Sequence, residues 1–394
     1  MRQELINHLD DLEDLANLLK SSFVGKDQIV ELMIICAMAQ EHLLIVGPPG
    51  TAKSELVKRF ALLCSPPHAG GRERTIPYFE YLLTRFTEPN ELFGPVDIKT
   101  YQEQGEHRRI TAGMLPRAEV AFLDEIFKAN SAILNALLTI LNERVYYNGG
   151  KAEVVPLLYA IGATNEVPDD SSLAALYDRF LVRVWSDNVE ESRFSELFQQ
   201  GWQLEKARIR TGYKMSLGNV ITTAVLRSLY RSLDEVNLEP VASHYREVVR
   251  RIRSEGIELS DRRVIKLLKL IAASALRRKS LEAHAGDFWV LKHVWNDPDQ
   301  MSHIAAIIDP YLEESGVDLR RPERRLELID NDLTGLTGQQ ESLRTDADFA
   351  DFLHQAESLR RELLGHSDSA GAAVLLDRAR EAIEETMTLL EQHG

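Results

Sequence analysis

The first half of the chain alternates short apolar runs with segments of helical periodicity. Apolar runs of strand length lie at residues 42–46, 77–83, 120–123, 157–163 and 182–185. Helical segments precede and separate them, and residues 1–40 divide into two helices at Val24–Asp27. Strands that alternate with helices predict a parallel sheet covered on both faces. The pattern therefore predicts an α/β core over residues 1–188.

The strand pattern ends near residue 189, and the rest of the chain is helical in pattern. Amphipathic periodicity at 190–207, 241–254, 261–279 and 288–295 predicts an all-α region over residues 189–305. Residues 306–394 are rich in Arg, Glu and Leu and predict a helical C-terminal accessory module. Because its apolar faces are sparse, we expect this module to pack on the preceding region or on a partner instead of forming its own core.

Composition and charge limit the functional classes. The chain has 394 residues, a formal net charge of −15 and an isoelectric point of about 5.3. This length suits two or three domains. The acidic charge disfavours sequence-independent binding of DNA or RNA, since phosphate backbones attract basic surfaces. No run approaches the ~20 apolar residues of a membrane span, and the N-terminus lacks the pattern of a secretory signal. We therefore expect a soluble, cytoplasmic protein.

The most informative stretch is GPPGTAKS, which lies between the apolar run 42–46 and a helical segment. It matches G-x-x-x-x-G-K-[ST] in the strand–loop–helix context that a phosphate-binding loop requires. Its glycines allow backbone N–H groups to turn toward phosphate oxygens at a helix N-terminus. Lys53 would reach the β- and γ-phosphates of ATP, and the Ser54 hydroxyl would help to hold Mg²⁺. The nucleotide-binding residues predicted here are Gly47, Pro48, Pro49, Gly50, Thr51, Ala52, Lys53, Ser54 and Glu55.

Two acidic residues follow the apolar run 120–123. A buried strand that ends in Asp124 and Glu125 delivers carboxylates to the sheet edge where ligands collect. Asp124 would hold Mg²⁺, and Glu125 would orient and activate an attacking water. The alternative is an acidic helix start, which suits the helix dipole. Asn165 follows the next apolar run and either positions the same water or forms a turn before Pro168.

Five segments together resemble the MoxR branch of the AAA+ ATPases and, within it, the RavA-type regulatory ATPases. They are GPPGTAKS, AFLDEIFKAN, ILNALLTILNERVYYNGG, GATNEVPDDSSLAALYDRFLVRVW and LSDRRVIKLLKL, and the similarity covers roughly residues 20–300. The resemblance implies an AAA+ P-loop core with a parallel sheet, an all-α lid, and Mg²⁺-dependent ATP hydrolysis in a ring, usually a hexamer. RavA-type proteins carry a β-rich domain after the lid, and no such pattern is evident beyond residue 310.

The resemblance also assigns roles by position. Asn165 matches the first sensor. Arg179 matches the arginine finger that enters a neighbouring subunit's site, although by itself it suggests a surface arginine paired with a nearby acid. Arg262 matches the second sensor, which reports the nucleotide state of its own subunit, and the adjacent Arg263 is the alternative. The segment that packs near adenine is matched by Val24 and Gly25.

Two segments resemble insertions of the branch. Glu91–Pro116 would carry the helix-2 insert, and Val145–Lys151 predicts a hairpin whose Asn-Gly pair forms the turn. Such insertions generally face the pore of the ring or its partners. For Tyr146 and Tyr147, a pore role and ordinary strand packing are both open.

For the chain as a whole, the resemblance implies a chaperone-like remodeller or activator of client proteins. MoxR-type ATPases typically work with a partner that bears a von Willebrand factor A domain, and the D-x-S-x-S pattern of that domain does not occur in this sequence. The client is not identified. A chelatase-type metal-insertion motor subunit is the alternative, and a DNA-processing AAA+ motor is a third candidate that the acidic charge disfavours. We expect residues after about 305 to be dispensable for ATP binding and ring formation.

Overall fold

The computed structural model describes residues 2–63, 78–168, 170, 173–189, 193–211, 221–315, 326–338 and 370–393, with isolated positions between 340 and 363. The chain divides into two compact units, Met1–Ser315 and Gly316–Gly394. In chain order, with η for a 3-10 helix, the first unit contains α1 (Gln3–Lys20), α2 (Asp27–Ala39), β1 (Leu43–Val46), α3 (Lys53–Leu63), β2 (Tyr78–Leu82), α4 (Pro89–Phe93), α5 (Ile98–Gln104), η1 (Leu115–Arg117), β3 (Val120–Asp124), η2 (Ile126–Lys128), α6 (Ser131–Glu143), β4 (Val145–Asn148), β5 (Lys151–Val154), β6 (Tyr159–Thr164), α7 (Ala174–Tyr177), β7 (Val182–Trp185), α8 (Phe194–Thr211), α9 (Thr223–Ser232), η5 (Leu233–Glu235), η6 (Glu239–Val241), α10 (Ala242–Ser254), α11 (Asp261–Arg277), η7 (Ala285–His293) and α12 (Gln300–Glu314).

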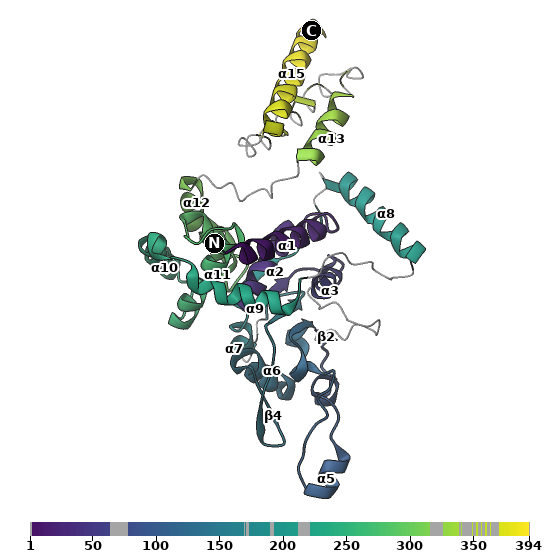
Figure 1. Ribbon diagram of the computed structural model, residues 1–394, viewed down its shortest axis with the longest axis vertical. Helices are drawn as coiled ribbons and strands as arrows, with labels where there is room; N and C mark the ends of the chain where they lie inside the picture. The colour runs from purple at the N-terminus through teal and green to yellow at the C-terminus, as the bar shows by residue number, and fades with distance from the viewer. Residues whose placement is uncertain are drawn as a thin grey trace. The chain divides into compact units, whose positions relative to one another are not determined.

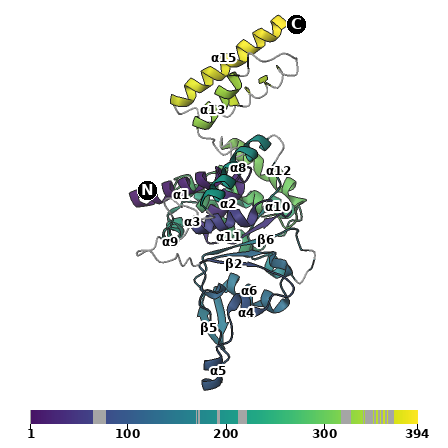
Figure 2. The ribbon, with the colours of Figure 1, turned by 90° about the vertical axis from the view of Figure 1, so that its right-hand side faces the viewer.

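A five-stranded parallel sheet in the order β2-β3-β6-β1-β7 forms the centre of the first unit (Figure 1). Strand β1 lies between β6 and β7, so that Val46 is opposite both Thr164 and Trp185. Every residue of β1 and β6 is buried, which explains why these strands are continuous apolar runs in the sequence. Helices α1, α2 and α3 lie on one side of the sheet and α6 on the other (Figure 2). The predicted α/β fold is confirmed.

The parallel arrangement gives the sheet two chemically distinct edges. The segments that follow β1, β3 and β6 all lie at the carboxyl edge, where ligands bind in folds of this class. The segments that precede β1 and β7 lie at the opposite, amino edge. The fold therefore brings the ends of three strands together and separates them from the residues that enter β7.

Helix α11, which follows β7 in the chain, packs against the core at the amino edge. Helix α11 contacts α2. The ammonium of Lys266 donates to Glu41 Oε2 at 2.6 Å, and Lys269 also forms an ion pair with Glu41, two residues before β1. Among the described residues, those after Trp185 form helices and isolated bridges only. The prediction that the lid region is all-α is confirmed. The helix predicted at 288–295 overlaps the 3-10 helix η7.

The hairpin β4–β5 turns at Gly149 and Gly150, whose φ angles are 60° and 79°, with Asn148 paired to Lys151. A tight turn of this kind needs left-handed backbone at both central residues, and the two glycines supply it. The turn is thus one residue later than the Asn-Gly pair predicts.

The side chain of Asn148 connects the hairpin to the neighbouring insert: it accepts from Arg109 N at 2.7 Å and donates to Arg109 O at 3.2 Å. These bonds join the hairpin to the insert that carries α5, and the two project together (Figures 1 and 2).

The two hairpin tyrosines have different surroundings. Tyr146 is buried and stacks on Phe93 of α4, with ring centroids 5.4 Å apart. Tyr147 is 60% exposed. Of the two alternatives, ordinary strand packing therefore accounts for Tyr146. Of the pair, only Tyr147 is accessible for contacts with another molecule.

The second unit has a core of its own, contrary to the expectation that its apolar faces are too sparse. Helices α13 (Leu326–Thr337) and α15 (Ala370–His393) pack together. The buried residues of this core are Leu333, Leu336, Phe352, Ala356, Leu359, Leu363, Leu375, Ala379 and Ala382. The sequence prediction failed because the apolar positions are spread over several segments, each of which is sparse when read alone.

The predicted boundary after residue 305 falls inside α12, whose buried side chains join the core of the first unit. Ile304 and Ile308 are fully buried, and Ile307 and Leu312 are almost so. The boundary between the two compact units lies instead between Ser315 and Gly316.

We predict that a chain ending at Ser315 keeps the melting temperature of the first unit, whereas a chain ending at residue 305 does not. The shorter chain lacks Ile307, Ile308 and Leu312, and burial of each such side chain contributes about 1.5–3 kcal/mol. A loss of this size lowers Tm by roughly 10 °C or more. Thermal unfolding followed by circular dichroism measures the difference, and equal Tm values for the two chains would contradict the assignment of α12 to the first unit.

Candidate functional site

The loop after β1 leaves the sheet in a conformation that requires glycine. Gly47 has φ +151°, and a Cβ atom there would lie 2.2 Å from the carbonyl oxygen of Ser186. Gly47 N donates to Thr164 O at 3.1 Å, and Ser186 N donates to Val46 O at 2.7 Å. The start of the loop is thus held between the ends of β6 and β7, directly before α3.

Lys53, the first residue of α3, folds back over this loop. Its ammonium donates to Gly47 O at 2.6 Å and to Pro48 O at 2.8 Å. Burial lowers the pKa of Lys53, while the charges of Asp124 and Glu125 act in the opposite direction. The predicted phosphate-binding lysine therefore donates to the loop carbonyls and is close enough to the two carboxylates to interact with them electrostatically.

Asp124 and Ser54 meet at the carboxyl edge of the sheet, as predicted. The Ser54 hydroxyl donates to Asp124 Oδ2 at 3.0 Å, and the other oxygen of Asp124 accepts from Glu125 N at 3.0 Å. A hydroxyl beside a carboxylate is a pair of hard oxygen donors, the class of ligand that Mg²⁺ takes in proteins. The two residues fit a Mg²⁺ site.

Glu125 lies beside Asn165, and both of its carboxylate oxygens are engaged. Asn165 Nδ2 donates to Glu125 Oε1 at 2.5 Å, and Lys128 Nζ lies 3.2 Å from Oε2. The backbone of Glu125 is left-handed, with φ 52° and ψ 42°, which is a strained conformation typical of functional sites. Sequence analysis missed Lys128, although its position three residues after Glu125 in a helical turn is a signal for such a pair.

A cavity of about 550 Å³ lies beside the loop, a volume typical of small-molecule sites. Val24, Gly50, Thr51, Ala52 and Glu55 line it, together with residues of α8. Gly25 does not line the cavity, but it lies beside Val189, and Val189 is one of the lining residues. Five of the predicted nucleotide-binding residues thus line this cavity, whereas Lys53 and Ser54 are not among its lining residues.

Lys26 also lines this cavity and was not identified from the sequence. Its ammonium is buried and donates to Ser186 Oγ at 3.1 Å and to Asp187 O at 2.5 Å. Burial lowers its pKa, with a smaller opposing effect of Asp187. Ser186 Oγ in turn donates to Thr51 Oγ1 at 3.2 Å. Lys26 therefore connects the segment before α2 to the segment after β7 and, through Ser186, to the phosphate loop.

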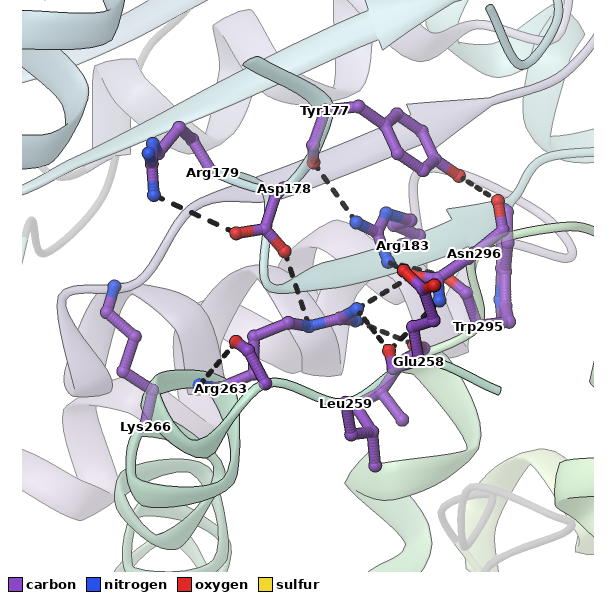
Figure 3. Close-up of polar contacts among 12 residues, drawn as sticks. Tyr177, Asp178, Arg179, Arg183, Glu258, Leu259, Arg263, Lys266, Trp295 and Asn296 are labelled. Atoms are coloured by element: carbon purple, nitrogen blue, oxygen red, sulfur yellow. Dashed lines mark hydrogen bonds and ion pairs between the residues drawn. The ribbon is translucent and has the colours of Figure 1, made fainter. Parts of the chain in front are cut away.

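Arg179 does not lie at this site. It precedes β7, whose first residue Val182 is opposite Leu43, the first residue of β1, whereas the phosphate loop follows the last residue of β1. The strand alone separates the two positions by about 10 Å at roughly 3.3 Å per residue. In this structure Arg179 Nη1 is 3.8 Å from the adjacent Asp178 carboxylate (Figure 3), so the alternative interpretation of a paired surface arginine describes its present contact.

Arg262 also lies away from the phosphate loop. It donates to Asn142 Oδ1 near the end of α6, from the exposed first turn of α11. Arg263 is buried and donates to the carbonyls of Glu258 and Val294. The structure therefore does not bring Arg262 to the phosphate loop of its own chain, contrary to the expectation, because α11 packs at the amino edge of the sheet.

The helices in the described part of the chain are all too short or too polar to span a lipid bilayer.

The sequence of the chain is similar to known protein families. Residues 10–227 match a family model described as the MoxR domain in the MoxR-vWA-beta-propeller ternary systems, and residues 241–308 match an AAA lid domain. Two uncharacterized proteins of Methanocaldococcus jannaschii are 37% and 36% identical over 298 residues, which are 75% of this chain and 73% and 74% of theirs. Chaperone MoxR1 of Mycobacterium tuberculosis is 28% identical over 169 residues, 42% of this chain and 41% of that protein.

The fold is similar to that of a candidate ATPase from Cytophaga hutchinsonii known from a crystal structure. The TM-score is 0.59 at 15% identity, and the similarity covers 79% of this chain and 96% of that one. A likeness at this identity supports the fold alone. The MoxR-domain match covers more than half of this chain, from residue 10 to residue 227, and it includes β1, β3, β6 and β7. This chain therefore belongs to the MoxR family of AAA+ ATPases.

Proposed function

We propose that the chain hydrolyses ATP, with Mg²⁺, at sites formed between adjacent copies in a ring, and that it uses this cycle to remodel or activate client proteins. The observation that carries the proposal is the convergence of Lys53, Ser54, Asp124, Glu125 and Asn165 at one edge of the sheet. These residues supply a cation for phosphate, oxygen donors for a metal ion, and a carboxylate with an amide beside it.

Each of these groups has a role in phosphoryl transfer. Lys53 would exchange the loop carbonyls for oxygens of the β- and γ-phosphates, because a charged partner binds an ammonium more strongly than neutral carbonyls do. Ser54 and Asp124 would hold Mg²⁺, which when bound neutralises charge on the same phosphates. Glu125 would accept a proton from the attacking water, and Asn165 would fix the orientation of that water and of Glu125.

The position of Arg179 supports catalysis between copies. Arg179 lies at the amino edge of the sheet, and the phosphate loop lies at the carboxyl edge of the same sheet. An arginine side chain cannot span that separation within one chain. In a head-to-tail assembly, the amino edge of one copy faces the carboxyl edge of the next, and Arg179 would then reach the γ-phosphate of its neighbour. Arg262, which is exposed at the amino edge, would approach the same neighbouring nucleotide.

Two further features support a role in acting on other proteins. The family model that matches residues 10–227 is named for systems with a vWA component, which supports a partner that bears a von Willebrand factor A domain. The insert and the hairpin project together and expose Ile98, Tyr101, Tyr147 and Val154. Exposed apolar side chains on a projecting element suit contact with a client protein.

We predict that Lys53→Ala abolishes nucleotide binding, whereas Glu125→Gln binds ATP with unchanged affinity but loses turnover by at least a hundredfold. The first variant lacks the phosphate-binding cation, and the second keeps the shape of Glu125 but not its basicity. Binding of a fluorescent ATP analogue and steady-state phosphate release measure the two effects separately.

Lys58→Ala is the matched control for the lysine, since Lys58 lies in the same helix, is exposed, and is 3.7 Å from Glu80. It is expected to bind ATP normally. Wild-type turnover in Glu125→Gln would remove Glu125 as the base.

We predict that Arg179→Ala and Glu125→Gln are each inactive alone and regain part of the activity when mixed. Arginine fingers contribute about 10³–10⁵-fold to turnover. In a mixed ring, some interfaces combine an intact Arg179 from one copy with an intact Glu125 from the next. Phosphate release at varied mixing ratios tests this, with native mass spectrometry to verify that mixed rings form. Mixed rings without activity would contradict the action of Arg179 between copies.

A further inference from the structure

Asp178 lies between the proposed arginine finger and the helical lid. Its Oδ2 is 3.8 Å from Arg179 Nη1, and its Oδ1 is 3.8 Å from Arg263 Nε of α11 (Figure 3). Arg179 and Asp178 belong to the segment before β7, whereas Arg263 belongs to the part of the chain that matches the AAA lid domain. One carboxylate therefore forms ion pairs with a residue of the core and with a residue of the lid.

The lid end of this contact is tightly held. Arg263 donates to Asn296 Oδ1 at 2.7 Å and to Val294 O at 2.7 Å, and its side chain is only 4% exposed. Asn296 Oδ1 also accepts from Arg183 of β7 at 3.1 Å, and Asn296 O accepts from Tyr177 Oη at 2.8 Å. The segment before α12 is thus connected to Tyr177 and to Arg183, which lie on either side of Asp178 and Arg179 in the chain.

The finger end is held more loosely. The Arg179 side chain is 22% exposed, compared with 4% for Arg263, although the two ion pairs with Asp178 have the same length of 3.8 Å. Within the described part of the chain, the Nε atoms of Arg179, Arg183 and Arg263 are buried without a hydrogen-bond partner. Burial lowers the pKa of Arg183 to about 9, and Arg263 adds to that effect. Positive charge is therefore in excess here, and Asp178 forms an ion pair with both Arg179 and Arg263.

We propose that Asp178 is a positioning residue that transmits the engagement of Arg179 to the lid. The inference rests on the proposed function, in which Arg179 contacts the ATP of a neighbouring copy. The γ-phosphate carries more negative charge than one carboxylate, so Arg179 leaves Asp178 when ATP is present. Asp178 then pairs with Arg263 alone, and the lid is held more firmly against β7. Release of phosphate restores the shared arrangement.

The test uses Asp178→Asn in the full-length chain, which keeps the size of the side chain and removes its charge. We expect kcat to fall about three- to tenfold with KM changed by less than twofold, because the residues that bind ATP are intact and only the coupling between Arg179 and the lid is lost. In the Glu125→Gln background, ATP is expected to slow amide hydrogen exchange at residues 294–300, and Asp178→Asn is expected to remove this ATP-dependent slowing.

Asp261→Asn is the matched control, because Asp261 lies in the first turn of α11, is 97% exposed and pairs with Arg253. It is expected to keep both kcat and the exchange response. Asp178→Glu keeps the charge and is expected to recover most of the activity. If Asp178→Asn lowers Tm substantially, the proposal is tested by comparing the activity of Asp178→Glu with that of wild type. Loss of activity in Asp178→Glu as well as in Asp178→Asn would overturn the proposal.

Two outcomes separate this inference from the proposed function. Wild-type kcat and a normal ATP response in Asp178→Asn, together with an inactive Arg179→Ala, would overturn the role of Asp178 alone. Normal turnover in Arg179→Ala would overturn the finger, and with it the inference. Faster exchange at residues 294–300 to the same degree with and without ATP would indicate a purely structural contact and would also overturn the proposal.

Discussion

The parallel pairing of β1 with β6 on one side and β7 on the other is the constraint on which the site depends. It fixes the register in which Val46, Thr164 and Trp185 are neighbours, so the segments that leave these strands share one edge of the sheet. Pairing of β3 with β6 adds Asp124 to the same edge. The same constraint places Arg179 at the opposite edge. A single chain of this fold can therefore assemble the groups that we propose bind ATP and activate water, but not the arginine that would complete the site.

The helical lid is also attached to the amino edge of the sheet, where Arg179 lies. Its helix α11 is held at the amino edge by ion pairs between two lysines and Glu41, which is buried directly before β1. A pair of buried arginines, Arg183 and Arg263, joins the lid to the start of β7 through Asn296. Buried charge of this kind contributes little net stability, since desolvation offsets much of the attraction, but it restricts the geometry of the contact. Helix α11 and the segment before α12 are thus coupled to the edge from which Arg179 would act, whereas α8 lines the cavity beside the phosphate loop.

Much of this could be predicted from the sequence, because local patterns carry it. The glycine loop, the strand that ends in Asp124 and the apolar runs of β6 and β7 each have a signature within about ten residues. What could not be predicted depends on contacts between distant segments. Lys26 contacts the phosphate-loop region only because β7 brings Ser186 beside it, and Asp178 forms an ion pair with the lid only because α11 brings Arg263 beside it. The choice between Arg262 and Arg263 depends on helix phase, which the cap formed by Ser260 with Arg263 N sets. The core of the second unit was missed for the same reason, since Leu333 and Ala379 lie on different helices.

The central claim is that one copy supplies the phosphate loop and the next supplies Arg179. Its most direct test is a cryo-electron microscopy structure of the Glu125→Gln protein assembled with ATP and Mg²⁺. The account predicts a ring in which Arg179 of each copy lies within hydrogen-bond distance of the γ-phosphate bound at Lys53 of its neighbour. An assembly with ATP bound at Lys53 and every Arg179 still paired with Asp178, far from any nucleotide, would contradict it.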